Sequence, residues 1–194
     1  THRALRILNE ASLIAAEDTR RARILTQHYQ IETPVTSYYE ANKQEKLNTI
    51  LQALSAGDVA LISEAGMPGL SDPGYELVQA ALANDYPVVP IPGPTAPVTA
   101  LVVSGLPSDR FLYLGFFPRQ ASRRRALLSE SRTSPYTLVA FETPHRLARA
   151  LADIEHVLGD RPIAVCREMT KLHEEIWRGT VSEARAYFTQ NKPR

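Results

Sequence analysis

Five short segments of this sequence contain glycine, proline or threonine, four of them together with acidic, basic or imidazole side chains, and each follows a predicted β-strand. They are residues 17–20, 64–74, 92–96, 142–146 and 167–171. In the longest segment, Gly66, Gly69 and Gly74 admit positive φ while Pro68 and Pro73 fix φ, which predicts a rigid bend whose backbone a ligand can approach closely. One such loop is also typical of an ordinary strand-to-helix turn. Because ligands bind at the carboxyl ends of strands in open α/β sheets, the five segments together predict one ligand-binding cleft.

The elements that position these segments alternate between short apolar runs and helical periodicity. Residues 13–16, 59–62 and 88–91 are predicted strands, and a predicted helix begins at Asp18 or Thr19. A second helix is indicated by apolar residues at i, i+3, i+4 and i+7, which are Leu47, Ile50, Leu51 and Leu54. This alternation predicts a parallel sheet covered by helices on both faces.

The pattern breaks at residues 105–109, where we place a domain boundary. The second half is predicted to contain an extended segment (111–117), an arginine-rich helix (119–130), a strand (137–141), a helix (147–158), a strand (163–167), an edge strand (175–178) and a helix (182–188). The predicted fold class is therefore α/β, with two tandem α/β domains at 1–110 and 111–194.

Composition limits the classes of function. The chain has 194 residues, 44% hydrophobic and 22% charged, as in a globular protein. Its single cysteine, Cys166, excludes an internal disulfide and a cysteine-built zinc site, which indicates a cytoplasmic protein. No apolar run approaches the roughly 20 residues of a membrane span. No metal site is indicated. The net charge of +1 means that any attraction to nucleic acid must come from a local patch.

Six motifs, in order along essentially the whole chain, resemble those of one enzyme family. They are Ala-Glu-Asp-Thr-Arg20, Ser-Glu-Ala-Gly-Met-Pro…Ser-Asp-Pro-Gly74, Pro-Gly-Pro-Thr-Ala96, Gly-Leu-Pro-Ser-Asp-Arg-Phe111, Phe-Glu-Thr-Pro-His-Arg146 and Arg-Glu-Met-Thr-Lys171. The family is that of the bacterial rRNA (cytidine-2'-O)-methyltransferases in the tetrapyrrole methylase superfamily. The resemblance implies a homodimer that binds S-adenosyl-L-methionine between two α/β domains. It also implies methylation of a ribose 2'-hydroxyl in small-subunit (16S) rRNA.

The sequence departs from the family pattern at three places. The family begins with a strand and a Pro-Ile-Gly-Asn-Leu-like turn, and it continues with a Gly-Glu and a final strand. We therefore expect the first and last strands to be missing here. The segment Glu64-Ala-Gly-Met67 replaces a commoner Asp-Ala-Gly-Thr.

The resemblance also implies site residues. Gly66, Met67, Leu70, Thr95 and Ala96 would contact the cofactor through their backbone, and by family position Phe141, Glu142 and Cys166 would line the second-domain side. Methyl transfer depends largely on positioning, but the ribose hydroxyl needs a proton acceptor within hydrogen-bond reach. The candidate acceptors are Glu17, Asp18, His145 and Glu168.

Each of these residue types also has a structural interpretation, which the sequence leaves open. The alternatives are a helix N-cap at Asp18, an ion pair of Glu17 with Arg20, a solvated His145 in the first turn after Thr143-Pro144, a surface pair of Glu168 with Lys171, and a small core residue at Cys166.

Two basic runs are candidates for RNA binding. They are Arg119, Arg123, Arg124, Arg125 and Arg132 in the second half, and Arg20, Arg21 and Arg23 beside the predicted cleft. The alternative for such a run is a solvated helical face. Phosphate binding would make affinity fall steeply with salt. Rival interpretations are a precorrin-type methylase on the same scaffold, which does not need an outward basic helix, and a non-catalytic RNA-binding module.

Overall fold

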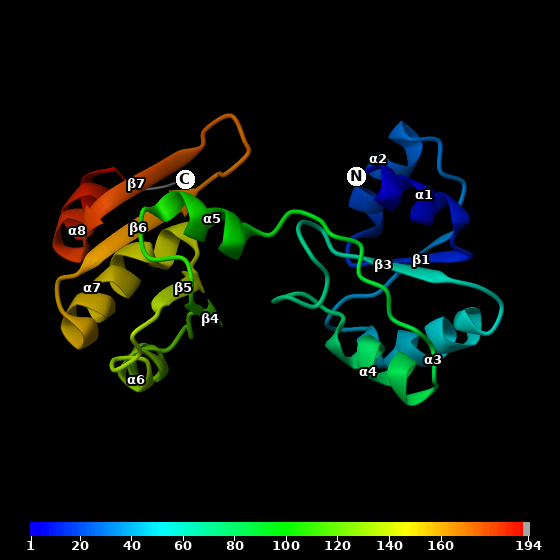
Figure 1. The fold of residues 1–194 in the computed structure, drawn as a ribbon, viewed down its shortest axis with the longest axis horizontal. Helices are drawn as coiled ribbons and strands as arrows, with labels where there is room; N and C mark the ends of the chain where they lie inside the picture. Colours follow the sequence, from blue (N-terminus) through cyan, green and yellow to red (C-terminus); the bar gives the residue numbers. More distant parts are fainter. Residues whose placement is uncertain (192–194) are drawn as a thin grey trace. The chain divides into compact units, whose positions relative to one another are not determined.

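A computed structural model describes residues 1–191 and shows two compact units, Thr1–Thr95 and a second one from Ala96 onward (Figure 1). This division lies before the boundary that we expected at 110/111. Helix α5 (Ala96–Ser104) lies in the second unit because it packs against β5 (Thr137–Phe141) and β6 (Pro162–Arg167) of that unit. No helix among the described residues is long and apolar enough to cross a membrane.

The first unit is built on a three-stranded sheet in the order β2-β1-β3. Its elements are α1 (His2–Glu10), β1 (Leu13–Ala16), α2 (Thr19–His28), β2 (Val35–Ser37), α3 (Lys43–Leu54), β3 (Val59–Ile62) and α4 (Tyr75–Ala83). Both strand pairs are parallel, with Ile14 of the central strand opposite Val35 and Ala60. The parallel sheet predicted for this half of the chain is therefore confirmed.

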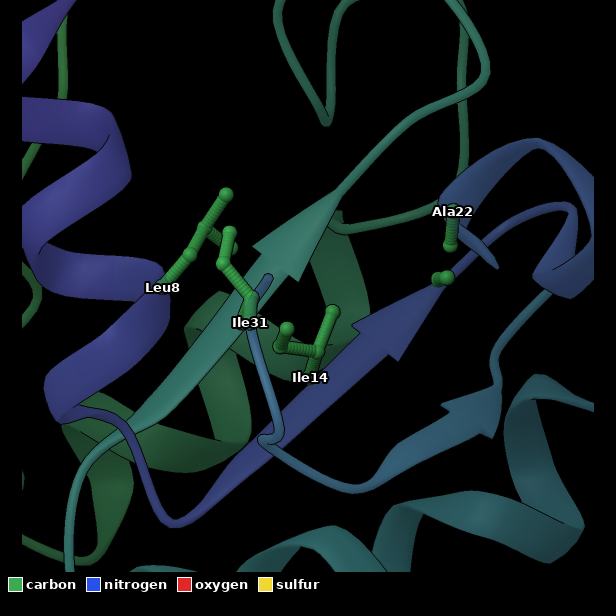
Figure 2. Packing of buried hydrophobic residues seen from close by; sticks show 5 residues of the cluster. Leu8, Ile14, Ala22 and Ile31 are labelled. Carbon is green, nitrogen blue, oxygen red and sulfur yellow. The ribbon is translucent and has the colours of Figure 1, made fainter. Parts of the chain in front are cut away.

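Alternate residues of these strands face opposite layers of helices. Ile14 and Ala16 belong to one core cluster with Leu8 of α1 and Ala22 of α2, and Figure 2 shows how Leu8, Ile14, Ala22 and Ile31 gather there. Ala15 belongs to a second cluster, which includes Ile50 of α3 and Leu77 of α4. Figure 1 shows α1 and α2 on one side of this sheet and α3 and α4 on the other. Helices thus cover both faces, as the sequence predicts.

Two predictions in the first unit differ from the structure. Strand β2 was not expected from the sequence, because three residues are too few to show a period. Residues 88–91 were expected to be a strand but have no regular secondary structure. Pro87, Pro90 and Pro92 each lack the backbone N–H that a ladder needs, which explains why this apolar run does not join the sheet.

The second unit contains two separate two-stranded sheets. Besides α5, β5 and β6, its elements are β4 (Phe111–Phe116), α6 (Ala121–Glu130), the 3₁₀ turn η1 (Pro144–Arg146), α7 (Leu147–Leu158), β7 (Glu175–Thr180) and α8 (Val181–Gln190). Strand β4 pairs with β5 in parallel, and β6 pairs with β7 in antiparallel fashion. The strands and helices predicted for this half are all present, with ends that differ by a few residues.

Helix α7 joins the two halves of the second unit's core. Ile154 packs both on the cluster of Phe117, Leu128 and Ala150 and on the cluster that contains Phe188 of α8. On the opposite face of β6, the Cys166 Sγ lies 4.0 Å from the Ala100 carbonyl of α5. The same helices therefore cover strands from both small sheets.

Candidate functional site

The loop after β3 is shaped by glycines in conformations that other residues adopt with strain. Gly66 has φ +88°, Gly69 has φ +80° and Gly74 has φ +156°. A Cβ on Gly74 would lie 3.0 Å from the Gly69 nitrogen, so two parts of the loop pass each other closely. The Ser63 hydroxyl donates to the Gly66 carbonyl at 3.1 Å and closes the first turn. The bend that the sequence predicts at this strand end is present.

This loop lies against the proline-rich segment that ends the first unit. A Cβ on Gly66 would lie 3.6 Å from the Pro94 carbonyl, and one on Gly93 would lie 3.5 Å from the Met67 Sδ. Gly66 and Met67 therefore lie beside the segment that leads to Thr95. Leu70, on the same loop, is partly exposed. Ala96 is the first residue of α5, in the other unit.

Three carboxylates lie around the ends of β1 and β3. The Glu17 Oε2 accepts from the Glu64 backbone nitrogen at 2.9 Å, and the Glu64 Oε1 lies 3.4 Å from the Arg21 Nε. Burial, together with the nearby charges of Glu17 and Glu64, raises the pKa of Asp72 above its ordinary value. Sequence reasoning did not name Asp72 as a proton acceptor. Its only sequence signal is its place in the same loop as Gly66, because its proximity to Glu17 depends on the fold.

Asp18 is the N-cap of α2, as its structural interpretation proposes. Its Oδ1 accepts from the Arg20 backbone nitrogen at 2.8 Å, and its Oδ2 is paired with the Arg20 Nη2 at 2.7 Å. The side-chain hydrogen bond from Arg20 is the largest cause that holds the pKa of Asp18 far below the usual carboxyl value. Asp18 is therefore a weak proton acceptor. Arg20 pairs with Asp18 rather than with Glu17, so the alternative of a Glu17–Arg20 pair was wrong.

In the second unit, Glu142 directly follows β5 and its side chain is 7% exposed. Its Oε1 accepts from the Thr143 backbone nitrogen and the Arg146 Nε, each at 2.6 Å. Arg146 also donates to the Phe117 carbonyl at 3.1 Å, which fixes the guanidinium. The buried Glu142 Oε2 has no hydrogen-bond partner in the structure. Buried polar atoms are normally satisfied, so this oxygen is suited to receive a donor from a ligand.

Other residues predicted near this end of the second unit differ in burial and contacts. Phe141 packs edge-on against Tyr113, with ring centroids 5.8 Å apart. His145 is exposed, and its Nε2 lies 3.4 Å from the Thr143 Oγ1. Glu168 is paired with Lys171 at 3.2 Å on the surface, which confirms the structural alternative for that residue.

A cavity of about 620 Å³ lies inside the second unit. Glu142 and Cys166, two of the predicted cofactor contacts, both line it. Burial raises the pKa of the Cys166 thiol, which keeps it protonated and unreactive at neutral pH. Among residues 1–191, no group of three or more His, Cys, Asp and Glu side chains could hold a metal ion.

The arginines of α6 separate into buried and exposed members. The Arg124 side chain is 4% exposed and forms an ion pair with Asp153, whose side chain is 6% exposed. Arg124 also donates to the Pro118 carbonyl at 3.0 Å, and Arg125 pairs with the other Asp153 oxygen at 2.6 Å. Because Arg124 points into the unit, it cannot contact phosphate. This corrects the expectation that it belongs to the RNA-binding patch.

The remaining basic candidates are at the surface. Arg119 and Arg123 are exposed, and Arg125 is half exposed despite its ion pair. In the first unit, Arg20 and Arg21 are also exposed, although each is paired with a carboxylate. An RNA-binding face at the start of α6 would therefore consist of Arg119, which lies just before the helix, and of Arg123 and part of Arg125 on it.

The sequence matches known proteins over nearly its whole length. Residues 1–185 match the model of the Tetrapyrrole (Corrin/Porphyrin) Methylases. Among curated relatives, "Ribosomal RNA small subunit methyltransferase I" of Halalkalibacterium halodurans is 48% identical over 95% of this chain and 64% of that protein. The proteins of the same name from Synechocystis sp. and Thermotoga maritima are 46% and 45% identical over all of this chain, and over 70% and 87% of their own lengths. The chain thus spans less than two thirds of the Halalkalibacterium relative.

Solved structures share the fold at lower identity. A cobalt precorrin-4 methyltransferase aligns with a TM-score of 0.66 and 17% identity, over 100% of this chain and 85% of that chain. A uroporphyrin-III C-methyltransferase from Thermus thermophilus, solved in complex with S-adenosylhomocysteine, aligns with a TM-score of 0.62 and 18% identity over the same shares. The family model matches residues 1–185, and the α/β fold is that of the solved methyltransferases. The chain therefore belongs to the tetrapyrrole methylase family.

Proposed function

We propose that this chain is the catalytic part of an S-adenosyl-L-methionine-dependent enzyme that methylates the ribose 2'-hydroxyl of a cytidine in small-subunit rRNA. The observation that carries the proposal is the 45–48% identity to three proteins named as ribosomal RNA small subunit methyltransferase I. The solved precorrin-4 and uroporphyrin-III methyltransferases are only 17–18% identical and support the fold alone.

Cofactor-contact residues are proposed for each unit by itself. In the first, the backbone of Gly66, Met67, Leu70 and Thr95 would provide apolar and carbonyl contacts, and the close approach of Gly66 to Pro94 supports this role. In the second, Ala96, Phe141, Glu142 and Cys166 would contribute. The unsatisfied Glu142 Oε2 would accept a hydrogen bond from an amino group of the cofactor.

The proposed proton acceptor is one of the carboxylates at the end of β1 and β3 or the exposed His145. Asp72 is the carboxylate of this group whose pKa is raised, by burial and by the charges of Glu17 and Glu64, and a raised pKa brings a base closer to the operating pH. Asp18 is a weaker candidate, because its charge is already neutralised by Arg20. Glu168 is likewise engaged with Lys171.

For RNA, we propose that exposed Arg119 and Arg123 contact phosphates of the subunit, with help from Arg20, Arg21 and Arg125. A substrate of this kind places the enzyme in the cytoplasm, and we further propose that it acts as a homodimer, which light scattering of the purified protein tests. A non-catalytic RNA-binding module remains the rival, and it would bind subunits without consuming the cofactor.

The decisive experiment measures tritium transfer from labelled S-adenosyl-L-methionine to small subunits that lack the modification, followed by mapping of the labelled nucleotide. The expected result is one labelled cytidine, with the methyl group on its ribose. Binding of subunits with no transfer of label supports the non-catalytic rival, and transfer to a tetrapyrrole but not to RNA supports the precorrin-type rival.

A matched pair of glycine variants tests the cofactor loop. Gly66 and Gly159 have φ +88° and φ +79°, so alanine is strained at both, by about 1–2 kcal/mol. Gly159 ends α7, and no atom lies within 4 Å of its Cβ position. We expect Gly66→Ala to weaken cofactor binding at least tenfold in calorimetry and Gly159→Ala to leave it unchanged. Equal affinities for the two variants would remove this loop from the cofactor site.

A charge-matched pair tests the arginine face. The double variant Arg119→Ala/Arg123→Ala should reduce the slope of log affinity against log salt by about 2, because each phosphate contact contributes about one unit. The control, Arg3→Ala/Arg6→Ala, removes the same charge from exposed positions on α1. If both double variants reduce the salt slope equally, the slope depends only on net charge, and the arginines near α6 do not bind phosphate specifically.

Single-turnover rates test the proton acceptor. We expect at least one of Glu17→Gln, Asp72→Asn and His145→Ala to lower the rate by about 10² or more, the usual contribution of a positioned base. Asp18→Asn and Glu168→Gln serve as comparisons, because both carboxylates are already paired. Rates equal to wild type for all five would exclude a side-chain base at these positions.

A further inference from the structure

Strand β4 contains a bulge just before its last residue. Between Tyr113 and Phe116 the register with β5 shifts, because Tyr113 lies opposite Val139 while Phe116 lies opposite Phe141. The stretch on β4 is therefore one residue longer than the stretch that it faces. Gly115 lies in it with φ +65°, a conformation that glycine adopts without strain. An extra residue of this kind redirects the side chains that follow it.

The bulge moves Phe116 to the other face of the strand. Residues two apart on a regular strand share a face, so Phe116 would otherwise follow Leu114 into the apolar core of the second unit. Instead its ring lies beside that of Phe141, with the centroids 5.0 Å apart. Phe116 is 54% exposed in this position. The extra residue thus takes a large apolar ring out of the core and holds it at the surface.

The chain that carries this ring is fixed by hydrogen bonds to its backbone. The Phe117 nitrogen donates to the Phe141 carbonyl at 3.0 Å, and the Phe117 carbonyl accepts from Arg146 at 3.1 Å. The next carbonyl, that of Pro118, accepts from the buried Arg124 at 3.0 Å. Because this backbone is already ordered, a partner of the ring would bind without the cost of ordering it.

The surroundings of the ring are basic. Arg119 and Arg123 follow it closely and are exposed, and no acidic residue occurs between positions 116 and 129. The proposed function assigns phosphate contacts to these two arginines but gives the ring no role. Sites for single-stranded RNA combine the same two features, because bases stack on aromatic rings while cations contact the phosphates.

We propose that Phe116 stacks on an unpaired base of the rRNA strand whose phosphates Arg119 and Arg123 contact. This inference rests on the proposed function for the identity of the RNA, and it adds a base contact to a surface otherwise described by charge alone. A second copy of the chain would also cover the ring, but a basic flank without carboxylates favours a polyanion. Since the neighbouring Phe141 is a proposed cofactor contact, the stacked base belongs to the methylated nucleotide or to one next to it.

The experiment measures equilibrium binding to small subunits that lack the modification, at several salt concentrations and with S-adenosylhomocysteine present. We expect Phe116→Leu to weaken binding at least about fivefold, the lower end for loss of one base–aromatic stack. The slope of log affinity against log salt should stay unchanged, because the variant removes no charge. Phe116→Tyr keeps the ring and should bind as wild type does. The matched control is Phe111→Leu, at the other end of β4 and 40% exposed, which should also bind normally.

Three results of these measurements overturn the proposal. One is an affinity of Phe116→Leu equal to that of wild type or of Phe111→Leu, and another is an equal loss for Phe116→Tyr. The third is a reduced salt slope for Phe116→Leu, since the weaker binding would then come from displaced arginines. Light scattering without subunits tests the other occupant of the surface. A loss of self-association in Phe116→Leu would place the ring between two copies of the chain and overturn the RNA contact.

A measurement on the wild-type protein does not depend on how the variants fold. Ultraviolet cross-linking of the complex with subunits, followed by mass spectrometry, should locate a nucleotide on Phe116. Cross-links confined to other residues overturn the proposal. Binding that depends on Phe116 without any methyl transfer supports this inference and contradicts the proposed enzyme. Methyl transfer together with normal binding of Phe116→Leu contradicts this inference alone.

Discussion

The two units use the same kinds of element but hold them together differently. In the first unit, backbone ladders join all three strands and each face of the sheet has its own apolar cluster. In the second unit, the ladders stop at a gap between two strand pairs, and α7 connects the two halves. The stability of the second unit therefore depends more on side-chain contacts that join its helices. The buried ion pair of Arg124 on α6 with Asp153 on α7 is one such contact.

The only tryptophan of the chain separates the two units experimentally. Trp177 lies in β7 and packs on the α8 cluster of the second unit. Its fluorescence reports unfolding of the second unit. Amide exchange of Ile14 and Ala15, both fully buried in the first sheet, reports opening of the first.

The largest expected effect is that of Asp153→Ala. This change leaves the Arg124 guanidinium buried without its partner, which costs about 4 kcal/mol. Urea unfolding followed by Trp177 fluorescence should show the loss, while exchange of Ile14 stays unchanged. Arg125→Ala removes the half-exposed partner of the same carboxylate and should cost less than about 1 kcal/mol. Equal losses for the two variants would contradict a special role for the buried pair.

The corresponding change in the first unit is Ile50→Ala. Ile50 is fully buried in the cluster with Ala15 and Leu77, and the cavity left behind should cost about 3 kcal/mol. Exchange of Ala15 should accelerate, while the Trp177 transition keeps its midpoint. A shift of both signals would show that the two units unfold as one cooperative body.

A smaller effect is expected from Asp18→Ala, which removes the N-cap of α2. Loss of the hydrogen bond to the Arg20 nitrogen should destabilise the first unit at neutral pH, by less than Ile50→Ala does. Since the pKa of Asp18 is lowered in the folded state, its contribution is present above the ordinary carboxyl value and is lost as pH falls through the folded pKa. The difference between wild type and variant, measured by exchange of Ala15, should shrink accordingly in acid.

The smallest effect, and one of opposite sign, is expected from Asp72→Asn. The pKa of Asp72 is raised by burial and by Glu17 and Glu64, so the charged form is unfavourable in the folded state. The variant should slightly stabilise the first unit at neutral pH. This gain should vanish as pH falls through the raised pKa to the ordinary value, because wild-type Asp72 is then protonated in both states. Destabilisation at neutral pH would instead indicate an attractive partner for Asp72.

Much of the fold follows from local patterns in the sequence. Residues 59–62 form a strand because an apolar run meets a glycine-rich bend, and Asp18 caps a helix because it precedes helical periodicity. Strand β2 is too short to show a period, and the prolines beside Val88 and Val89 override an apolar run. The division of the second sheet was not predictable, because it depends on which strands find partners.

The candidate site was predictable as loops rather than as individual contacts. The sequence identified the segments of Met67 and Thr95, and the structure brings these two together. It could not separate buried Arg124 from exposed Arg123, because the partner of Arg124 lies 29 residues away. It also could not identify Asp72, whose pKa is raised by burial and by the charges of Glu17, in another segment, and of Glu64.

The bend at Gly66 has a consequence for how this protein can change over evolutionary time. Its shape is set by backbone torsions and by the absence of a side chain, so many residue types at neighbouring Met67 are compatible with the same curvature. Natural variation is therefore expected to concentrate at position 67 while position 66 stays invariant. Side chains beside Gly66 can therefore change between relatives while the backbone conformation of the loop stays the same.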